Sequence, residues 1–163
     1  MSRKKLIGIV AACIIVVTVV LVISLSGRGS VVTFPDPNLE TAIREALNKP
    51  SGPIHASELA GLASLTASDS GIEHLSGLQY CTNLTDLDFW HNQISDISPL
   101  ANLTSLTYLY LPRNQISDIL PLVNNPGLSQ GDEVYLSSNP LSSTSMNTYI
   151  PQLQARGVTV HWP

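Results

Sequence analysis

Charged residues are scarce in this chain of 163 residues, and basic residues are the scarcest. Lysine and arginine together number eight, and four of these, Arg3, Lys4, Lys5 and Arg28, flank one apolar block near the N-terminus. The remaining four stand against all twelve carboxylates, so the rest of the chain carries a formal charge of about −8. Because phosphate backbones are bound through a basic face, we predict no nucleic-acid partner.

Cysteine pairs, metal-ligand clusters and catalytic motifs are also lacking. The only two cysteines are Cys13, inside the apolar block, and Cys81, so no intramolecular disulfide is expected and the fold must be stable without one. The four histidines are scattered without metal-ligand spacing, and there is no G-x-S-x-G and no phosphate-binding glycine loop. We therefore expect no cofactor, no metal site and no enzymatic activity.

The one long hydrophobic run is Leu6–Leu25, which contains no charged residue. A helix of about 20 residues spans roughly 30 Å, the thickness of the bilayer hydrocarbon. "SRKK" precedes the run, and by the positive-inside rule this end stays in the cytoplasm while the chain from Arg28 onward lies outside. We predict a single-pass anchor that contacts the lipid bilayer through Leu6–Leu25, with residues 1–5 cytoplasmic and residues 26–33 as a linker.

Two other interpretations of the apolar block stay open. A cleaved signal peptide has an apolar core of about 7–15 residues and ends in an A-x-A-like site, whereas this run is longer and "SLSGRGS" fits such a site poorly. "VAAC" at Val10–Cys13 resembles a bacterial lipoprotein box with Cys13 as the lipidated residue. Against it, twelve uncharged residues follow Cys13, where a lipoprotein usually becomes polar.

A capped helix is predicted after the linker, in "FPDPNLETAIREALNKPSG". Asp36 can cap its N-terminus, Pro37 lies in the first turn, where its missing N–H costs nothing, and Pro50 and Gly52 lie beyond the end. One face of the helix is apolar and must pack on another part of the protein. This face is made of Leu39, Ile43, Ala46 and Leu47. We predict that residues 34–61 form a helical N-terminal cap.

The rest of the chain, residues 62–163, is predicted to be repetitive. "NQISDIS" at Asn92–Ser98 recurs 22 residues later as "NQISDIL" at Asn114–Leu120. Alignment on the apolar positions gives units at 62–83, 84–105 and 106–127, and an irregular unit that begins near Gly131 and continues into a helix and a final strand, "VTVHW". The shared pattern, L-x-x-L-x-L-x-x-N-x-I/L, is that of the leucine-rich repeat, in which stacked units bury one common core.

The combination of "FPDPNLETAIREAL" with 22-residue units containing "NQISDISPLANLTSL" resembles the bacterial internalin-type leucine-rich-repeat proteins over Phe34–Gly127. The resemblance implies a helical cap that closes the N-terminal end of a short curved parallel sheet, and a concave face that binds a protein. The expected fold class is therefore α/β, a leucine-rich-repeat solenoid with a helical N-terminal cap, preceded by one transmembrane helix. The chain departs from the family pattern in being short, with two regular repeats between two irregular ones.

Several recurring residues are predicted to be scaffold. Three asparagines share the ninth repeat position, where their side-chain amides would satisfy backbone groups as the chain leaves each strand; they are Asn92, Asn114 and Asn139. Asp96 and Asp118 recur at one position and are predicted to make local turn hydrogen bonds. Cys81 aligns with the inward Leu103 and is predicted to be a small core residue rather than a reactive thiol.

The side chains at repeat positions 3, 5 and 7 should point away from the core, because strand side chains alternate. They are small and polar in the first unit, and aromatic or acidic in the next three. Tyrosine and tryptophan often anchor interfaces. We predict a ligand-binding concave face formed by Asp86, Asp88, Trp90, Tyr108, Tyr110, Glu133, Tyr135 and His161.

The alignment also assigns positions to the last strand and to Arg113. It places Thr159 at position 5 with Tyr135, and His161 at position 7 with Trp90. Arg113, at position 8, could pair with a neighbouring carboxylate. The alternative interpretation of the aromatic residues is that they have high strand propensity and stack sideways between neighbouring strands.

The predicted function is that of a cell-surface, membrane-anchored binding module. It would recognise a protein, or less readily a glycan, through the concave face, with its N-terminus cytoplasmic and its repeat domain extracellular. The alternative is a structural spacer, or a truncated repeat remnant, without a ligand of its own.

Overall fold

The computed structural model describes residues 29–163. The predicted cytoplasmic N-terminus, the apolar segment Leu6–Leu25 and the alternative lipidation site at Cys13 lie outside these described residues. Within residues 29–163, no helix is both long enough and apolar enough to cross a membrane.

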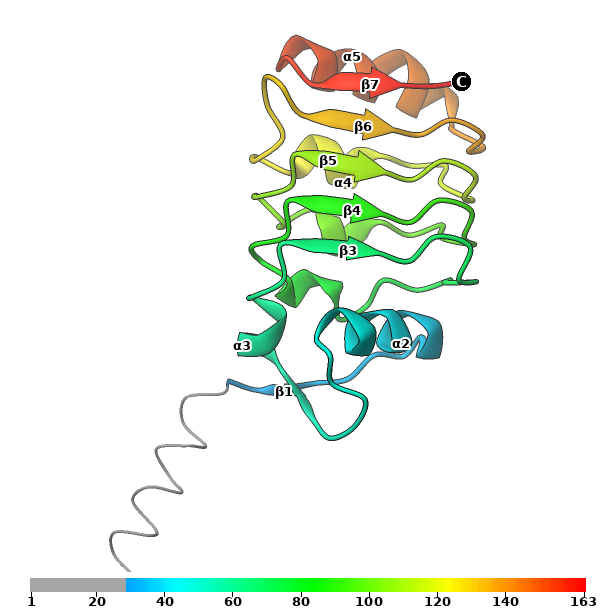
Figure 1. Ribbon diagram of the computed structural model, residues 1–163. Coiled ribbons are helices and arrows are strands. Elements are labelled where there is room, and N and C mark those ends of the chain that lie inside the picture. Colours follow the sequence, from blue (N-terminus) through cyan, green and yellow to red (C-terminus); the bar gives the residue numbers. More distant parts are fainter. Residues whose placement is uncertain (1–28) are drawn as a thin grey trace, which may run out of the picture.

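Five short parallel strands, hydrogen-bonded in chain order, form the main sheet (Figure 1). They are β3 (Ser64–Thr66), β4 (Asp86–Asp88), β5 (Tyr108–Tyr110), β6 (Glu133–Tyr135) and β7 (Thr159–His161). The middle residue of every strand is buried and the residues on either side of it are not, as alternation along a strand requires. The predicted α/β leucine-rich-repeat fold with a parallel sheet is confirmed.

The chain returns from each strand through a short helical segment behind the sheet (Figure 1). These segments are η1 (Leu78–Tyr80), η2 (Ser98–Leu100), α4 (Leu120–Asn124) and, after β6, the π-helical turn η3 (Ser145–Tyr149) with α5 (Ile150–Ala155). The core fills the space between sheet and returns, with Leu87, Ile94, Leu109 and Ile116 among its fully buried side chains. Full burial of one such side chain stabilises the fold by about 1.5–3 kcal/mol, and stacking of the units makes that burial possible.

The recurring asparagines join neighbouring units. The Asn114 amide donates to the carbonyls of Phe89 and Leu111, at 2.9 and 3.1 Å, and its Oδ1 accepts the backbone N–H of Ile94 at 3.1 Å. Asn92 and Asn139 make equivalent bonds in their own units. The prediction that these residues are scaffold is confirmed.

The other predicted scaffold residues also have the expected environment. Asp96 Oδ1 accepts the N–H of Ser98, and Asp118 Oδ1 accepts the N–H of Leu120, each at 2.8 Å within its own turn. Cys81 is fully buried, and that burial raises the pKa of its thiol to about 12. A thiol with this pKa is protonated at neutral pH, so Cys81 acts as a core residue.

The N-terminal cap begins with a two-stranded antiparallel sheet and a helix. Strand β1 (Val31–Val32) pairs with β2 (Ile54–His55), so part of the segment predicted as a linker, 26–33, is a strand. Helix α2 (Pro37–Ala46) is capped by Asp36 as predicted, and the short helix α3 (Ala56–Leu59) follows β2.

The buried face of α2 differs from the prediction at one residue. Leu39 and Ile43 are fully buried and Leu47 is partly buried, but Ala46 is exposed and Ala42 is buried in its place. The buried face of α2 therefore includes Ala42 and leaves out Ala46, the last residue of the helix. Alanine is small enough to be accommodated at either position without a cavity.

The register of the last strand also differs from the prediction. Thr159 pairs with Glu133 and His161 with Tyr135, so Thr159 occupies position 3 and His161 position 5. The distance from Glu133 to Thr159 is 26 residues along the chain, compared with 22 from Asp86 to Tyr108. The extra residues lie in the longer return formed by η3 and α5. The prediction allowed too few residues for that return.

Candidate binding surface

The sheet presents two rows of side chains on the side away from the core, which we call the sheet face. The first row is Ser64, Asp86, Tyr108, Glu133 and Thr159, and the second is Thr66, Asp88, Tyr110, Tyr135 and His161. Seven of the eight residues predicted to bind a ligand lie in these two rows. The eighth, Trp90, lies two residues after the end of β4 and is partly buried.

Four rings at the middle and C-terminal end of the sheet face form an aromatic cluster, Tyr108, Tyr110, Tyr135 and His161. The centroid of Tyr135 lies 5.5 Å from that of Tyr108, 5.2 Å from that of Tyr110 and 4.1 Å from that of His161, with the His161 pair stacked. The rings therefore stack sideways between strands, as the alternative interpretation expects. All four remain at least partly accessible, so one surface of the cluster faces solvent.

Three carboxylates border the aromatic cluster. Glu133 Oε2 accepts the Tyr135 hydroxyl at 2.8 Å, Asp88 Oδ1 accepts the Ser68 hydroxyl at 2.9 Å, and Asp86 Oδ2 accepts the Thr85 hydroxyl. The ion pairs found within residues 29–163 are Arg44–Glu40, Lys49–Glu58 and His91–Asp69, and none of them involves these three carboxylates.

The carboxylates affect the ionisation of the tyrosines. Burial, and then the charges of Tyr110, Asp88, Glu133 and Asp86, raise the pKa of Tyr108. The hydrogen bond to Glu133 is the main cause of the raised pKa of Tyr135. Both phenols therefore stay protonated at neutral pH. The Tyr108 hydroxyl can donate a hydrogen bond to a ligand, whereas the Tyr135 hydroxyl already donates to Glu133 and can only accept one.

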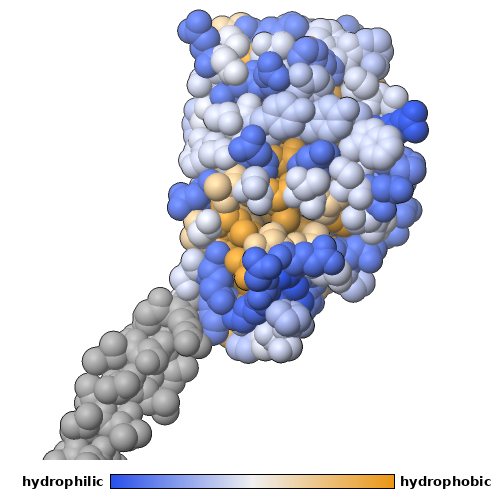
Figure 2. Space-filling view, viewed as in Figure 1, coloured by the Kyte–Doolittle hydropathy of each residue, from blue (hydrophilic) through white to orange (hydrophobic). Residues whose placement is uncertain are grey.

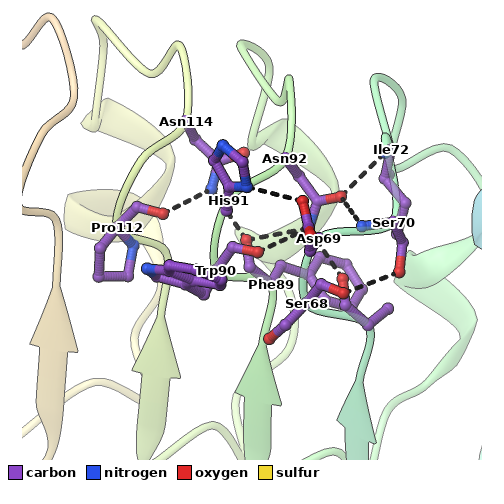
Figure 3. A network of polar contacts seen from close by, with 11 residues as sticks. Ser68, Asp69, Ser70, Ile72, Phe89, Trp90, His91, Asn92, Pro112 and Asn114 are labelled. Carbon is purple, nitrogen blue, oxygen red and sulfur yellow. Dashed lines mark hydrogen bonds and ion pairs between the residues drawn. The ribbon is translucent and has the colours of Figure 1, made fainter.

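A second group of side chains, which sequence reasoning missed, lies just beyond the carboxyl ends of the strands (Figure 3). Position 8 of each unit has a left-handed backbone, with φ of +53° at Asp69, +54° at His91 and +56° at Arg113. His91 Nδ1 lies 2.7 Å from Asp69 Oδ1, a contact drawn in Figure 3. The available signal was weak: of the residues at position 8, only Asp69 and His91 are of types that adopt this backbone more often than others.

Trp90 lies beside this group. The guanidinium carbon of Arg113 is 5.7 Å from the Trp90 ring centroid, and the centroid of the His91 ring is 5.2 Å from the same point. Within residues 29–163 the suggested ion pair of Arg113 with a carboxylate is not found, and its guanidinium lies near the Trp90 ring instead. Pro112, at position 7, is buried and not exposed as predicted, and its carbonyl accepts the His91 N–H at 3.0 Å.

A groove of about 470 Å³ separates α2 from the N-terminal edge of the sheet face. It is lined by Asn38, Thr41, Ala42 and Glu45 from α2, and by Thr66, Ala67, Ser68 and Ser70 from the first repeat. The sheet-face residues of β3 are small, so the groove opens directly onto the rows described above. Figure 2 shows hydrophobic surface here, between the hydrophilic surface over α2 and the middle strands.

No group of three or more His, Cys, Asp or Glu side chains within residues 29–163 could hold a metal ion. The functional groups of the sheet face are aromatic rings, hydroxyls and carboxylates. Such a surface stacks, donates and accepts hydrogen bonds, and attracts cations.

Comparison with known proteins agrees with this architecture. Residues 82–124 match the family model described as leucine-rich repeats in two copies. The chain is 37% identical to internalin C of the bacterium Listeria monocytogenes over 60 residues, which are 36% of this chain and 20% of that protein. It is 36% identical to internalin H of the same species over 66 residues, or 39% of this chain and 12% of that protein.

A solved structure extends the similarity to most of the described residues. The crystal structure of an internalin, InlF, from Listeria monocytogenes superposes with a TM-score of 0.65 at 36% identity, covering 73% of this chain and 35% of that one. The repeat domain is therefore similar in sequence and fold to the leucine-rich repeats of internalins, and we call it the internalin-like module. The chain spans about a third or less of the length of each of these relatives.

Proposed function

We propose that the internalin-like module binds a protein through the sheet face. The observation that carries the proposal is the aromatic cluster, whose accessible rings are bordered by three carboxylates without a cationic partner among the described residues. Tyrosine supplies a large contact area at a low cost in conformational entropy, and tyrosine and tryptophan are enriched among residues that dominate binding energy.

The packing within the cluster favours this function. The rings hold one another, and the Tyr135 hydroxyl is fixed by Glu133, so little side-chain freedom remains to be lost when a partner docks. The groove beside α2 extends the same surface toward the N-terminal cap. A partner segment lying across the strands would contact the cluster and the groove together.

We also propose that the module is displayed outside a bacterial cell. The similarity to internalins and the apolar segment Leu6–Leu25 with its preceding basic residues support this location. Proteolytic shaving of intact cells tests it, because a surface module would be removed while a small membrane-bound fragment stays behind. Recovery of the intact module from the medium would contradict the uncleaved anchor.

The binding function is tested by capture from surface extracts with the whole chain in a neutral detergent. Changing Tyr108 and Tyr110 to alanine should abolish capture, while the matched change Tyr80→Ala should leave it intact. Tyr80 is also an exposed tyrosine, at 40% exposure, but it lies in η1 behind the sheet. Thermal unfolding of each variant confirms that the fold survives. Capture that persists without the two tyrosines would exclude the sheet face.

A structural spacer is the second candidate, and the sideways ring contacts favour it. In that case the cluster stabilises the stack of strands, each aromatic pair contributing about 0.5–1.5 kcal/mol. The same variants separate the two functions. A spacer would lose stability when the tyrosines are replaced, but no partner would be captured by the unmodified chain.

A further inference from the structure

The described part of the chain has no basic side chain available to neutralise the carboxylates of the sheet face. Arg44 and Lys49 are paired with carboxylates in the N-terminal cap. Arg156 donates to the backbone carbonyls of Val123, Asn125 and Leu128 behind the sheet. The fourth basic residue, Arg113, lies over Trp90. The carboxylates beside the aromatic cluster can therefore pair with a cation from another molecule.

The carboxylates are arranged around one ring. The register of the sheet pairs Tyr108 with Asp86 on one side and with Glu133 on the other. Neighbouring strands lie about 4.8 Å apart, so both carboxylates border the Tyr108 ring within one strand spacing. Asp88 adds a third negative charge near the same tyrosine, and its charge contributes to raising the pKa of Tyr108. A cation lying over Tyr108 would be held by the ring below and by carboxylates at its edges.

The geometry favours a guanidinium over an ammonium group. A guanidinium is planar, stacks on an aromatic face and presents several N–H donors at its rim, which suits carboxylates on two sides of a ring. An ammonium group is compact and strongly hydrated, and it gains less from a flat platform. The domain already contains one contact of this kind, with the Arg113 guanidinium 5.7 Å from the Trp90 ring centroid.

We propose that the sheet face binds an arginine-bearing segment of a partner protein, with one guanidinium over Tyr108 between Asp86 and Glu133. This inference rests on the proposed function and adds the chemical class of the partner. The negative formal charge of the domain, with twelve carboxylates against four basic residues after Arg28, would also accelerate the approach of a basic segment at low salt.

The test uses synthetic peptides as probes and the whole chain in a neutral detergent. One peptide carries two arginines in a glycine–serine background, the second carries two lysines at the same positions, and the third carries two glutamines. Binding is measured by isothermal titration or by peptide fluorescence anisotropy at low and at high salt. The arginine peptide should bind several-fold more tightly than the lysine peptide, and the glutamine peptide should not bind. High salt should lower the affinity of the arginine peptide.

Charge-neutralising variants locate the site. Asp86→Asn and Glu133→Gln should each weaken binding of the arginine peptide by about tenfold, since a hydrogen bond to a charged group contributes about that much to an equilibrium. The matched control is Glu73→Gln, which removes the same charge from an exposed residue in the return after β3. It should leave binding unchanged. Thermal unfolding of all three variants checks that each remains folded.

The inference and the proposed function can fail separately. If a captured partner depends on Tyr108 but not on Asp86, Glu133 or salt, the sheet face is a binding surface and the arginine proposal is overturned. Equal binding of the arginine, lysine and glutamine peptides would overturn it too, as would tight binding of a neutral oligosaccharide that survives both acidic substitutions. If neither partner nor peptide responds to the Tyr108 and Tyr110 substitutions, both proposals are wrong.

Discussion

The carboxylate of Asp36 accepts the backbone N–H of His74 at 2.9 Å, which links the N-cap of α2 to the return after β3. Its Oδ2 also accepts the N–H of Glu73, while Oδ1 accepts the N–H groups of Asn38 and Leu39. One side chain therefore caps a helix and joins the cap to the first repeat. The prediction from sequence covered only the first of these roles.

Replacing Asp36 with alanine should destabilise the domain by about 2–4 kcal/mol. A lost N-cap costs about 0.5–2 kcal/mol, and the hydrogen bonds to His74 and Glu73 are lost as well. Urea unfolding at pH 7 measures the difference. Asp118→Ala is the control, because Asp118 caps an exposed turn within one unit and should cost less than about 1 kcal/mol. Equal losses at both positions would mean that the contact with the first repeat contributes nothing.

The same carboxylate should make stability depend on pH. Burial alone would raise the pKa of Asp36, but backbone N–H groups of His74, Glu73, Leu39 and Asn38 together hold it below the ordinary value of 3.8. The folded-state pKa is depressed, so this contribution is complete above pH 3.8 and is lost as the pH falls below it. The difference in unfolding free energy between the unmodified chain and Asp36→Asn should shrink over that acidic range. A difference that stays constant down to pH 2 would contradict the assignment.

Asn114→Ala should be among the most destabilising single substitutions. It leaves the buried N–H of Ile94 without its side-chain acceptor, and an orphaned group of this kind costs about 1–3 kcal/mol. It also removes one of the two amide donors to each of the carbonyls of Phe89 and Leu111, which keep their bonds to Asn92 and Asn139. The expected loss is about 3 kcal/mol or more in urea unfolding. The matched change at the exposed Asn102 should be within about 0.5 kcal/mol of neutral. A small loss at Asn114 would mean that water replaces the amide.

Gly127 is required by a close backbone approach rather than by its dihedral angles. A Cβ at this position would lie 2.0 Å from the carbonyl oxygen of Thr104 in the preceding unit. Gly127→Ala should therefore separate the third return from the second and cost about 1–3 kcal/mol or more. Gly61→Ala is the control, because its Cβ would meet the Glu58 carbonyl at 3.2 Å, a contact that a small shift can relieve. Thermal unfolding should rank the two variants in that order.

The parts of the fold that repeat could be predicted from sequence, and the parts that do not repeat could not. The repeated "NQISDI" made it possible to predict the register of the strands from β3 to β6. Its asparagine and isoleucine are buried and recur 22 residues apart, so each strand could be placed relative to them. After Tyr135 no such spacing exists, since η3 and α5 lengthen the return, and the positions of Thr159 and His161 were misassigned by two residues. The sequence pattern did not show where the last strand begins, because the return before it contains a different type of helix and more residues than the earlier returns.

For the sheet face, the alternation of strands was enough to bring Asp86, Tyr108 and Glu133 into one row. It could not show how the rings contact one another, because ring orientation depends on side-chain packing across three strands. The groove beside α2 was missed for a similar reason. It exists because small residues on β3 face a helix that is distant from them in the sequence.

Arg156 should resist replacement even by lysine. Its guanidinium donates to the carbonyls of Val123, Asn125 and Leu128, which joins the end of α5 to the preceding return. A lysine keeps the charge but lacks the planar fork, so it cannot reach all three carbonyls in one orientation. Arg156→Lys should lower the free energy of unfolding by about 1–3 kcal/mol, whereas Arg113→Lys, at an exposed residue, should change it by less than about 0.5 kcal/mol. If both substitutions are neutral in urea unfolding, the three carbonyls are satisfied without the guanidinium, and the last strand is held by its ladder to β6 alone.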